Sequence, residues 1–479
     1  MSDLPRARLT VQQAQDQISK ARDQGYRPSE KKTGVVTRNL KRVFSAIVTV
    51  DGPSAQDIAG ILDLSPGTVS GLVTQLENLK FVRVVSGRTA SQGRRPKPIV
   101  IDDRIRHIVG FEISAEKVTG VVMNLAGEAV LDQTVDLGSE VWTKAGNKGA
   151  DKGWVDQDKV VDSVRGIYAT LKEQLLDHIA GRHPDILETG HDPIVGIGVV
   201  LGGHINRHTG EVLFAPDLRW GTPRRRQTVE WGPTVQLRQR IRDVTGVDQR
   251  NIVVDNDANG RAAAYQLYGG GAYFNDAPST VVLVTDVGVG AAHFIDQEIY
   301  RGATGKSLEF GNILMVPNGL PCRCGDRGCL EAVATCNAIL ASSKFDTLEE
   351  AYAAAANGND KKAQAAAIKG FTDAGTLLGT GLSILVDLLD TSRIVLTGPA
   401  ITHSDRSGPI VFDQHYDRAM REAVQEHVYG AGIDPDNIEV IAEDGEWNGA
   451  RGAACLVVHD MIAGHLGYLE AKSPRKTVG

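Results

Sequence analysis

Three of the five cysteines in this 479-residue chain lie within eight residues, at Cys322, Cys324 and Cys329. Three thiolates at this spacing can hold one zinc ion, and Gly325 and Gly328 allow the loop between them to wrap around it. Such sparse cysteine use excludes an extracellular disulfide framework and favours a reducing compartment, the cytoplasm. Reduced, buried thiols without a metal are the alternative interpretation.

A second group of residues has the chemistry to bind DNA. The pair Ser65-Pro66 is typical of a helix start, because Ser caps free backbone N–H groups and Pro suits the first turn. A shorter helical pattern that Ser54 can cap precedes it, so the two predict a helix-turn-helix whose second helix enters the major groove. The outward face of that second helix is small and polar: Ser65, Gly67, Thr68, Ser70, Gly71 and Thr74.

A basic loop follows between two strand-like runs, residues 81–85 and 99–101. Strand, basic loop and strand predict the wing of a winged helix, and Arg side chains on such a loop suit narrow minor grooves. The basic residues of this loop are Arg88, Arg94, Arg95 and Lys97. An ordinary small helical subdomain is the alternative interpretation.

The distribution of charge agrees with a DNA-binding N-terminal region. Residues 1–107 contain 18 Lys and Arg against 10 Asp and Glu, whereas the remainder contains 34 against 49, within a net charge of −7. A basic segment on an acidic body predicts that only the segment contacts a polyanion, although a solvated basic surface would look the same. We expect a polar extension over residues 1–34, partly helical or disordered, and the winged helix over 35–107.

Residues 108–479 alternate between apolar strand-like runs and helical patterns, separated by glycine turns. This alternation predicts an α/β protein with largely parallel sheets, and the length predicts two lobes with a cleft. The residues Met-Ser-Asp-Leu-Pro-Arg at the start of the sequence contain no apolar run, so we expect no signal peptide. Apolar stretches such as Ala374–Val386 are shorter than the ~20 residues that span a bilayer. The expected strands are 108–113, 118–124, 130–135, 194–201, 252–254, 280–285 and 393–396, and the expected helices are 160–179, 235–244, 258–268, an Ala-rich region over 348–389, and 449–462.

Over roughly residues 35–465 the chain resembles the ROK family, named for repressor, open reading frame and kinase. The most specific motif is Glu309-Phe310-Gly311-Asn312, then nine residues, then Cys-Arg-Cys-Gly-Asp-Arg-Gly-Cys-Leu-Glu over 322–331. The family pattern is Glu-x-Gly-His, nine to eleven residues, then Cys-x-Cys-Gly-x-x-Gly-Cys-x-Glu. The resemblance implies an actin-like, sugar-kinase-like fold of two lobes over 108–479, whose C-terminal helix returns to the first lobe.

The resemblance also implies that the zinc is structural and fixes the loop that aims Glu309 and Glu331 at the ligand. The family's fourth zinc ligand is the His of Glu-x-Gly-His, and Asn312 stands there. An Asn oxygen is a poor zinc ligand, which leaves the fourth position to water, to another side chain or to nothing.

The sugar site of the family maps onto residues that this chain keeps. Asn256 and Asp257 match the sugar-binding Asn and the general-base Asp of the kinases. Gly203 matches the family's glycine at the end of a strand, where the backbone approaches the sugar closely. With Glu309, Asn312 and Glu331 they offer many acceptors and few cations, which suits a neutral polyol. Ion pairs with nearby Arg side chains are the alternative.

The family's ATP motifs are altered in this chain. The first phosphate loop, Asp-x-Gly-Gly-Thr-Lys in the family, reads Glu-Ile-Ser-Ala-Glu-Lys over 112–117 and lacks both glycines. The second, Gly-Thr-Gly-x-Gly, begins with Asp286, and the late Gly-Gly is Thr397-Gly398. Two carboxylates, Glu116 and Asp286, would face the phosphates, so we expect no ATP cofactor and no phosphoryl transfer.

Together these features predict a sugar-responsive transcriptional regulator, most simply a repressor, with operator DNA and a sugar or sugar derivative as partners. Ligand would change lobe closure and the spacing of two DNA-binding heads in a homodimer or homotetramer. Two alternatives remain open: a working sugar kinase with a DNA-binding head, and a regulator whose effector is a partner protein.

The basic loop yields a first prediction. Replacing Arg94 and Arg95 with Ala should weaken DNA binding, since each lost phosphate contact lowers the slope of log affinity against log salt by about one unit. Fluorescence anisotropy over a salt series measures both quantities. If affinity and slope are unchanged, this loop does not contact DNA.

Overall fold

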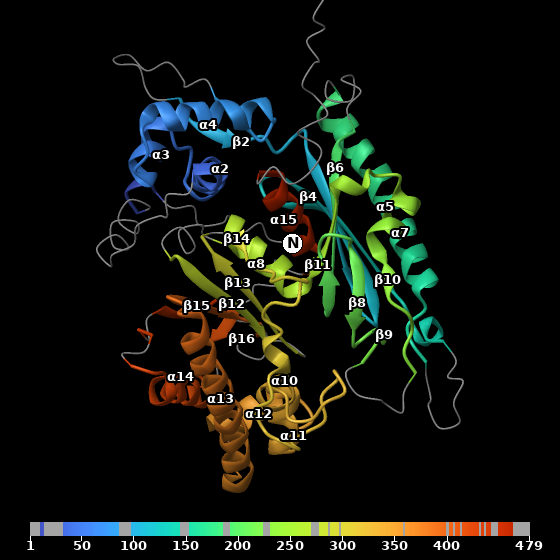
Figure 1. The fold of residues 1–479 in the computed structure, drawn as a ribbon, viewed down its shortest axis with the longest axis vertical. Helices are drawn as coiled ribbons and strands as arrows, with labels where there is room; N and C mark the ends of the chain where they lie inside the picture. Colours follow the sequence, from blue (N-terminus) through green and yellow to red (C-terminus); the bar gives the residue numbers. More distant parts are fainter. Residues whose placement is uncertain are drawn as a thin grey trace, which may run out of the picture.

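The computed structural model in Figure 1 consists of a small helical head joined to an α/β body. It describes residues 10–13, 32–85, 97–143, 153–184, 192–223, 230–269, 277–285, 288–296, 298–357, 360–398, 402–405, 408–411, 414–430, 433–434, 437–441 and 449–462. The α/β architecture agrees with the alternating pattern of the sequence. We use "head" for the described residues between 32 and 102 and "body" for those from 107 onward.

The head contains three helices and a two-stranded antiparallel sheet in which Val82 faces Ile101. Its elements are α2 (Lys32–Thr49), α3 (Ala55–Leu62), α4 (Pro66–Asn78), β1 (Val82–Val84) and β2 (Ile99–Ile101).

Capping residues fix where the two short helices of the head begin. The Ser54 side chain accepts a hydrogen bond from the Asp57 backbone N–H, and the Asp57 carboxylate accepts one from the Ser54 backbone N–H, which completes a capping box. Ser65 caps α4 by accepting from the Thr68 N–H at 3.1 Å, with Pro66 in the first turn. Both helices therefore start at the Ser residues that the sequence indicates.

The first lobe of the body is built on a five-stranded sheet in the order β11-β6-β3-β4-β5. Strands β11, β6 and β3 run parallel, while β4 and β5 continue as antiparallel neighbours. Helix α5 (Gln157–Arg182) packs on β4 and β5, and α7 (Leu237–Thr245) packs on β11. The strands are β3 (His107–Ile113), β4 (Lys117–Asn124), β5 (Ala129–Asp136), β6 (Ile194–Leu201) and β11 (Ile252–Asn256).

The second lobe repeats this topology in the order β14-β13-β12-β15-β18. Strands β12, β15 and β18 are parallel, and β13 and β14 are antiparallel neighbours. The strands are β12 (Ser279–Thr285), β13 (Val289–Ile295), β14 (Glu298–Ile299), β15 (Arg393–Thr397) and β18 (Ile438–Val440). The helices are α10 (Leu330–Ala334), α11 (Cys336–Ser343), α12 (Leu348–Asn357), α13 (Lys361–Leu389) and α14 (Gln414–His427).

Two helices, α8 (Asp257–Tyr268) and α15 (Gly449–Ile462), pack against each other in the middle of the molecule (Figure 1). Helix α15 lies on β3 and β6 of the first lobe, while α8 also packs on β12 and β13 of the second. One continuous apolar core joins these helices to Phe44 and Leu76 of the head, so the head is packed onto the body.

The structure refines several sequence-based expectations. The Ala-rich region is two helices, because Asp360 caps the start of α13. Val235 belongs to a strand, β10 (Val235–Gln236), in a small sheet with β7 (His204–Asn206), β8 (Glu211–Ala215) and β9 (Trp220–Gly221). The sequence analysis missed this sheet, β18 and the hairpin of β16 (Thr402–Asp405) and β17 (Gly408–Val411), whose strands have five residues at most.

Helix α13 is a candidate membrane span by length and composition, although its charge-free stretch, Ala374–Val386, is shorter than a bilayer, as the sequence indicates. Its 29 residues meet the length and hydropathy that such a span requires, since charges are sparse along it. Half of the apolar stretch is buried, and the helix packs against α11, α12 and α14. This environment is that of a core helix of the second lobe.

The close approach of α15 to the first sheet yields a second prediction. A Cβ added at Gly198 of β6 would lie 1.9 Å from the Ala453 backbone oxygen, which cannot move away as a flexible side chain can. Gly198→Ala should lower the free energy of unfolding by about 1–3 kcal/mol, measured by denaturant titration. Gly166→Ala is the control, because its Cβ meets nothing within 4 Å on exposed α5, and it should not destabilise. Equal stability of the Gly198→Ala protein would contradict this packing.

Candidate functional site

A cleft of about 660 Å³ opens between the two lobes of the body. It is lined by the β3–β4 turn, the end of β6, the start of α8, the β12–β13 connection and the loop that precedes α10. All six residues that the sequence analysis assigns to sugar binding line it: Gly203, Asn256, Asp257, Glu309, Asn312 and Glu331.

Asn256 and Gly203 hold the first-lobe wall of the cleft together. The Asn256 side chain caps α8 by accepting from the Ala258 N–H at 2.8 Å, and its Nδ2 donates to the Gly203 carbonyl at 3.0 Å. Gly203 has φ +139°, and a Cβ there would lie 2.2 Å from the Phe214 oxygen. Glycine is therefore required where the strand end meets the neighbouring sheet.

Asp257 is the first residue of α8, and its Oδ1 accepts from the Ala258 N–H at 3.0 Å. Burial raises the pKa of the Asp257 carboxyl, while the nearby Arg261 guanidinium acts to lower it. Arg261 also lies 3.9 Å from Glu112 Oε1, between the sugar-site carboxylate and the first altered phosphate motif.

Arg323 connects the two walls of the cleft. Its Nη1 contacts the two carboxylate oxygens of Asp217 at 2.7 and 2.8 Å, and its Nη2 lies 3.4 Å from Glu331 Oε2. Asp217 belongs to the first lobe, whereas Arg323 lies in the cysteine loop of the second. The sequence analysis missed Asp217, Arg261 and Arg323, although an Arg between two cysteines was a visible signal.

Among the described lining residues, acidic side chains outnumber basic ones by six to three. The basic ones are Lys117, Arg261 and Arg323, and the latter two face carboxylates. Excess acceptors favour a ligand that donates hydrogen bonds, such as a neutral polyol, over a triphosphate. The alternative of Arg ion pairs therefore holds for part of the cleft, because Arg323 contacts Glu331.

The first altered phosphate motif forms a closed turn between β3 and β4. Ser114 Oγ accepts from the backbone N–H groups of Glu116, at 3.3 Å, and Lys117, at 3.1 Å. The Ser114 N–H itself donates to the Lys117 carbonyl. A phosphate loop needs such N–H groups directed at the anion, and in this turn they are used within the turn.

The second altered motif is only partly described. Glu116 lines the cleft as expected, whereas Asp286 lies outside the described residues. Gly288 lies against Arg323 and Glu331, so a Cβ there would be 2.6 Å from Arg323 Nη2. Gly398, with φ +112°, lies against the Thr285 backbone in the same way.

The three cysteines converge beside Arg323 and Glu331 of the cleft wall. The Sγ atoms of Cys322, Cys324 and Cys329 lie within 4.8 Å of one another, so the cluster can bind a metal ion. No His, Asp, Glu or further Cys from the described part of the chain joins this group. Gly328, with φ +76°, is needed for the wrap, since a Cβ there would lie 1.6 Å from the Val316 oxygen.

Hydrogen bonds connect the cysteine cluster to the cleft. Cys322 Sγ donates to Glu331 Oε1 at 3.0 Å, and the Sγ atoms of Cys324 and Cys329 are 3.7 Å apart. A hydrogen bond with Cys322 lowers the pKa of the Cys324 thiol to about 6, whereas the hydrogen bond with Cys324 raises the pKa of the Cys322 thiol and burial raises that of Cys329 to about 11, so Cys324 is the first of the three to ionise. A low thiol pKa favours the thiolate, the form that binds metals.

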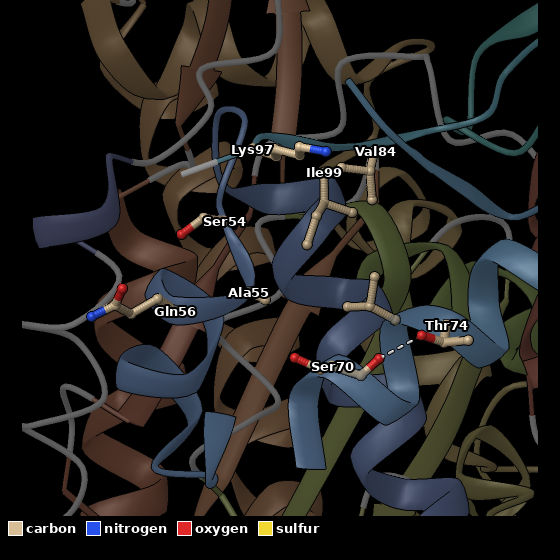
Figure 2. A pocket seen from close by; sticks show the side chains of 9 residues that line it. Ser54, Ala55, Gln56, Ser70, Thr74, Val84, Lys97 and Ile99 are labelled. Carbon is tan, nitrogen blue, oxygen red and sulfur yellow. Dashed lines mark hydrogen bonds between the residues drawn. The ribbon is translucent and has the colours of Figure 1, made fainter. Parts of the chain in front are cut away.

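The head presents a separate polar surface. All six predicted DNA-binding residues of α4 are exposed, as is Lys97, whereas Arg88, Arg94 and Arg95 lie outside the described residues. A groove of about 320 Å³ lies between the start of α3, α4 and the β1–β2 sheet. Figure 2 shows the side chains that line it. Ser54, Gln56, Ser70, Thr74 and Lys97 line it.

A model of the ROK family matches residues 163–460. The xylose repressor of Bacillus subtilis (strain 168) is 24% identical over 402 residues, which cover 82% of this chain and 87% of that protein. The glucokinase of Streptomyces coelicolor (strain ATCC BAA-471 / A3(2) / M145) is 27% identical over 338 residues, which cover 67% of this chain and 98% of that protein.

Among solved structures, a ROK family transcriptional regulator described as a homologue of the E. coli MLC protein shares the fold. The TM-score is 0.59 at 18% identity, over 90% of this chain and 98% of that one. The expected two-lobed fold behind an N-terminal helical region is thereby confirmed.

Proposed function

Because the chain belongs to the ROK family, we propose that it is a DNA-binding transcriptional repressor whose body binds a sugar or sugar derivative without phosphorylating it. One observation carries the proposal: the cleft keeps the sugar-site residues, while the Ser114 turn uses the backbone N–H groups that a phosphate would need.

The head is the proposed DNA-binding unit, a winged helix. The exposed residues at the start and along one face of α4 are small and uncharged, so the helix backbone can approach the bases and phosphates closely. They are Ser65, Gly67, Thr68, Ser70, Gly71 and Thr74. Lys97 lies beside this face across the groove of Figure 2 and would contact a phosphate. The xylose repressor among the relatives supports the same role.

The cleft is the proposed effector site. Hydroxyl groups of a sugar would donate to Asp257, Glu309 and Glu331, and Gly203 would allow close approach of the ring. Asn312 lines the same cleft and would add an amide. The names of the relatives make D-xylose and D-glucose the first ligands to test.

An active sugar kinase with a DNA-binding head is the second candidate. A glucokinase among the relatives and the position of Asp257 favour it, since this carboxylate occupies the general-base position of ROK kinases. The closed Ser114 turn and the acidic excess in the cleft oppose it. A regulator that answers to a partner protein would keep the head and bind no sugar.

We further propose that the metal ion of the cysteine cluster is zinc, held by Cys322, Cys324 and Cys329. Three sulfur donors suit Zn²⁺, which prefers sulfur and nitrogen ligands. Its role would be structural, because the loop carries Arg323 and leads into Glu331, both of which line the cleft. A DNA-binding repressor of this kind would act in the cytoplasm as a homodimer or homotetramer.

Ligand titrations test the proposed function. The unaltered protein should gain thermal stability with one of D-xylose and D-glucose but not with ATP, since only ligands of the folded state raise the midpoint. Asp257→Asn should weaken that sugar by roughly tenfold to a hundredfold, the effect of losing a charged acceptor worth about 1.5–3 kcal/mol. Asp373→Asn, on the exposed face of α13, is the control.

The rival functions give different results in these assays. Sugar-dependent ADP release at an ordinary kinase rate, on the order of 1–100 s⁻¹, would establish the kinase instead. Glu116→Thr combined with Asp286→Gly should not create such activity, because the Ser114 turn remains closed. A protein that binds DNA but neither sugar would favour a partner-protein effector.

Metal analysis tests the zinc proposal. We expect about one zinc per chain after purification without chelator. Cys324→Ser should lower both zinc content and thermal stability, since a structural metal contributes folding free energy. Cys336→Ser, outside the cluster, should change neither. Absence of metal would mean that Asn312 has abolished the site, and Asn312→His should then restore it.

A further inference from the structure

Lys41 of α2 is a buried lysine in the head that contacts both lobes of the body. Its side chain is only 4% exposed, and its Nζ lies 2.6 Å from Glu298 Oε1 and 3.1 Å from His459 Nε2. An ammonium group excluded from solvent to this degree is tolerated only when it pairs with an acidic or hydrogen-bonding group. Lys41 is therefore a fixed point of contact between head and body.

Its two partners belong to different lobes. Glu298 is on β14, the edge strand of the second-lobe sheet, and its side chain is 45% exposed. His459 is on α15, which packs on β3 and β6 of the first lobe. The Lys41 Nζ consequently lies at the point where both lobes meet the head.

The contact continues from His459, a buried polar side chain, to the wall of the cleft through the charged groups of Asp460, Arg207 and Asp255. His459 Nδ1 is 3.6 Å from Asp460 Oδ1, and Asp460 pairs with Arg207. Arg207 Nε lies 3.5 Å from Asp255 Oδ2, which also accepts from Arg301 Nε at 2.7 Å.

Asp255 brings this series of contacts to the sugar site. Its Oδ1 accepts from the Asn256 N–H at 2.9 Å and from Asn259 Nδ2 at 2.8 Å. Burial acts to raise the pKa of Asp255, but Arg301 and Arg207 outweigh it, so the pKa is lowered and the carboxylate stays ionised. Along this series of contacts, three cations pair with three carboxylates: Lys41 with Glu298, Arg207 with Asp460, and Arg301 with Asp255.

Movement of α2 would reach the DNA-binding surface directly. Helix α2 packs against α3 and α4 within the head and against α8 and α15 of the body. Helix α8 begins at Asp257, so the helix that touches the cleft at its start also packs against α2 of the head.

We propose that Lys41 senses the relative position of the two lobes and passes sugar-induced lobe movement to the DNA-binding head. This inference rests on the proposed function. When the lobes move around a sugar, the separation of Glu298 from His459 changes, and one ammonium group keeps both contacts only if α2 moves with them. A ligand can shift this equilibrium only as far as it prefers one arrangement.

Two variants test the coupling without touching the cleft. Lys41→Met keeps the length of the side chain and removes the charge, while Glu298→Gln keeps the shape of the partner. Glu439→Gln is the matched control, because Glu439 makes a comparable pair with Arg393 in the same sheet but away from the head. If Lys41→Met lowers the melting temperature, Glu298→Gln carries the test, since its half-exposed carboxylate is easily replaced.

The measurements use the full chain with D-xylose or D-glucose, whichever raises the melting temperature, and a duplex selected by the sugar-free protein from random DNA. In the unaltered protein, sugar should weaken DNA binding by about tenfold or more, within the usual range of allosteric coupling. Both variants should bind sugar within about twofold of the unaltered protein, but their DNA response should fall below about threefold. Hydrogen exchange in α2 should change with sugar in the unaltered and Glu439→Gln proteins only.

The failures of the two proposals are distinguishable. If the unaltered protein responds to sugar and both variants respond equally, the coupling through Lys41 is overturned and the proposed function stands. If the unaltered protein binds sugar without any change in DNA affinity, or binds no sugar, the proposed function fails and the coupling fails with it.

Discussion

The buried carboxylate of Asp255 is the interaction on which the arrangement of head, lobes and cleft depends. It lies within β11, a parallel strand of the first lobe, and Arg301, which compensates it, comes from the second lobe. A carboxylate in such surroundings is stable only with its cations in place, so the pair joins the two lobes at this point. The same carboxylate orients Asn256 and Asn259 at the start of α8, which makes the geometry of the cleft a consequence of the lobe contact.

Closure of the Ser114 turn and retention of the residues proposed to bind sugar are physically independent in this fold. The sugar-site residues lie where strands end and α8 begins, positions that the sheet fixes. The phosphate N–H groups belong to the β3–β4 turn, where a single Ser114 side chain can take them up without disturbing β3, β4 or Asp257. A kinase-like body can therefore lose its nucleotide site while keeping the cleft.

Much of this architecture could be predicted from the sequence because the signals are local. Ser54 and Ser65 mark helix starts by capping, and apolar runs such as 194–201 mark buried strands. The Arg323–Asp217 pair and the contacts of Lys41 could not be predicted, since they join residues 106, 257 and 418 positions apart. Hydrophobic periodicity and helix capping are local signals and carry no information about such distant pairs. The strands β7–β10 are too short to show an alternating hydrophobic pattern.

The packing of the head explains why charged groups rather than apolar ones are suited to carry a signal to it. The shared core of α2, α8 and α15 holds the head against the body, but apolar contact is non-directional and tolerates small sliding. A hydrogen-bonded ion pair depends on distance and direction, more steeply in a buried setting than in water. Lys41 adds an ion pair with the second lobe and a hydrogen bond with His459 of α15 at one atom, so we expect a shift too small to unpack the core still to change which position of α2 is favoured.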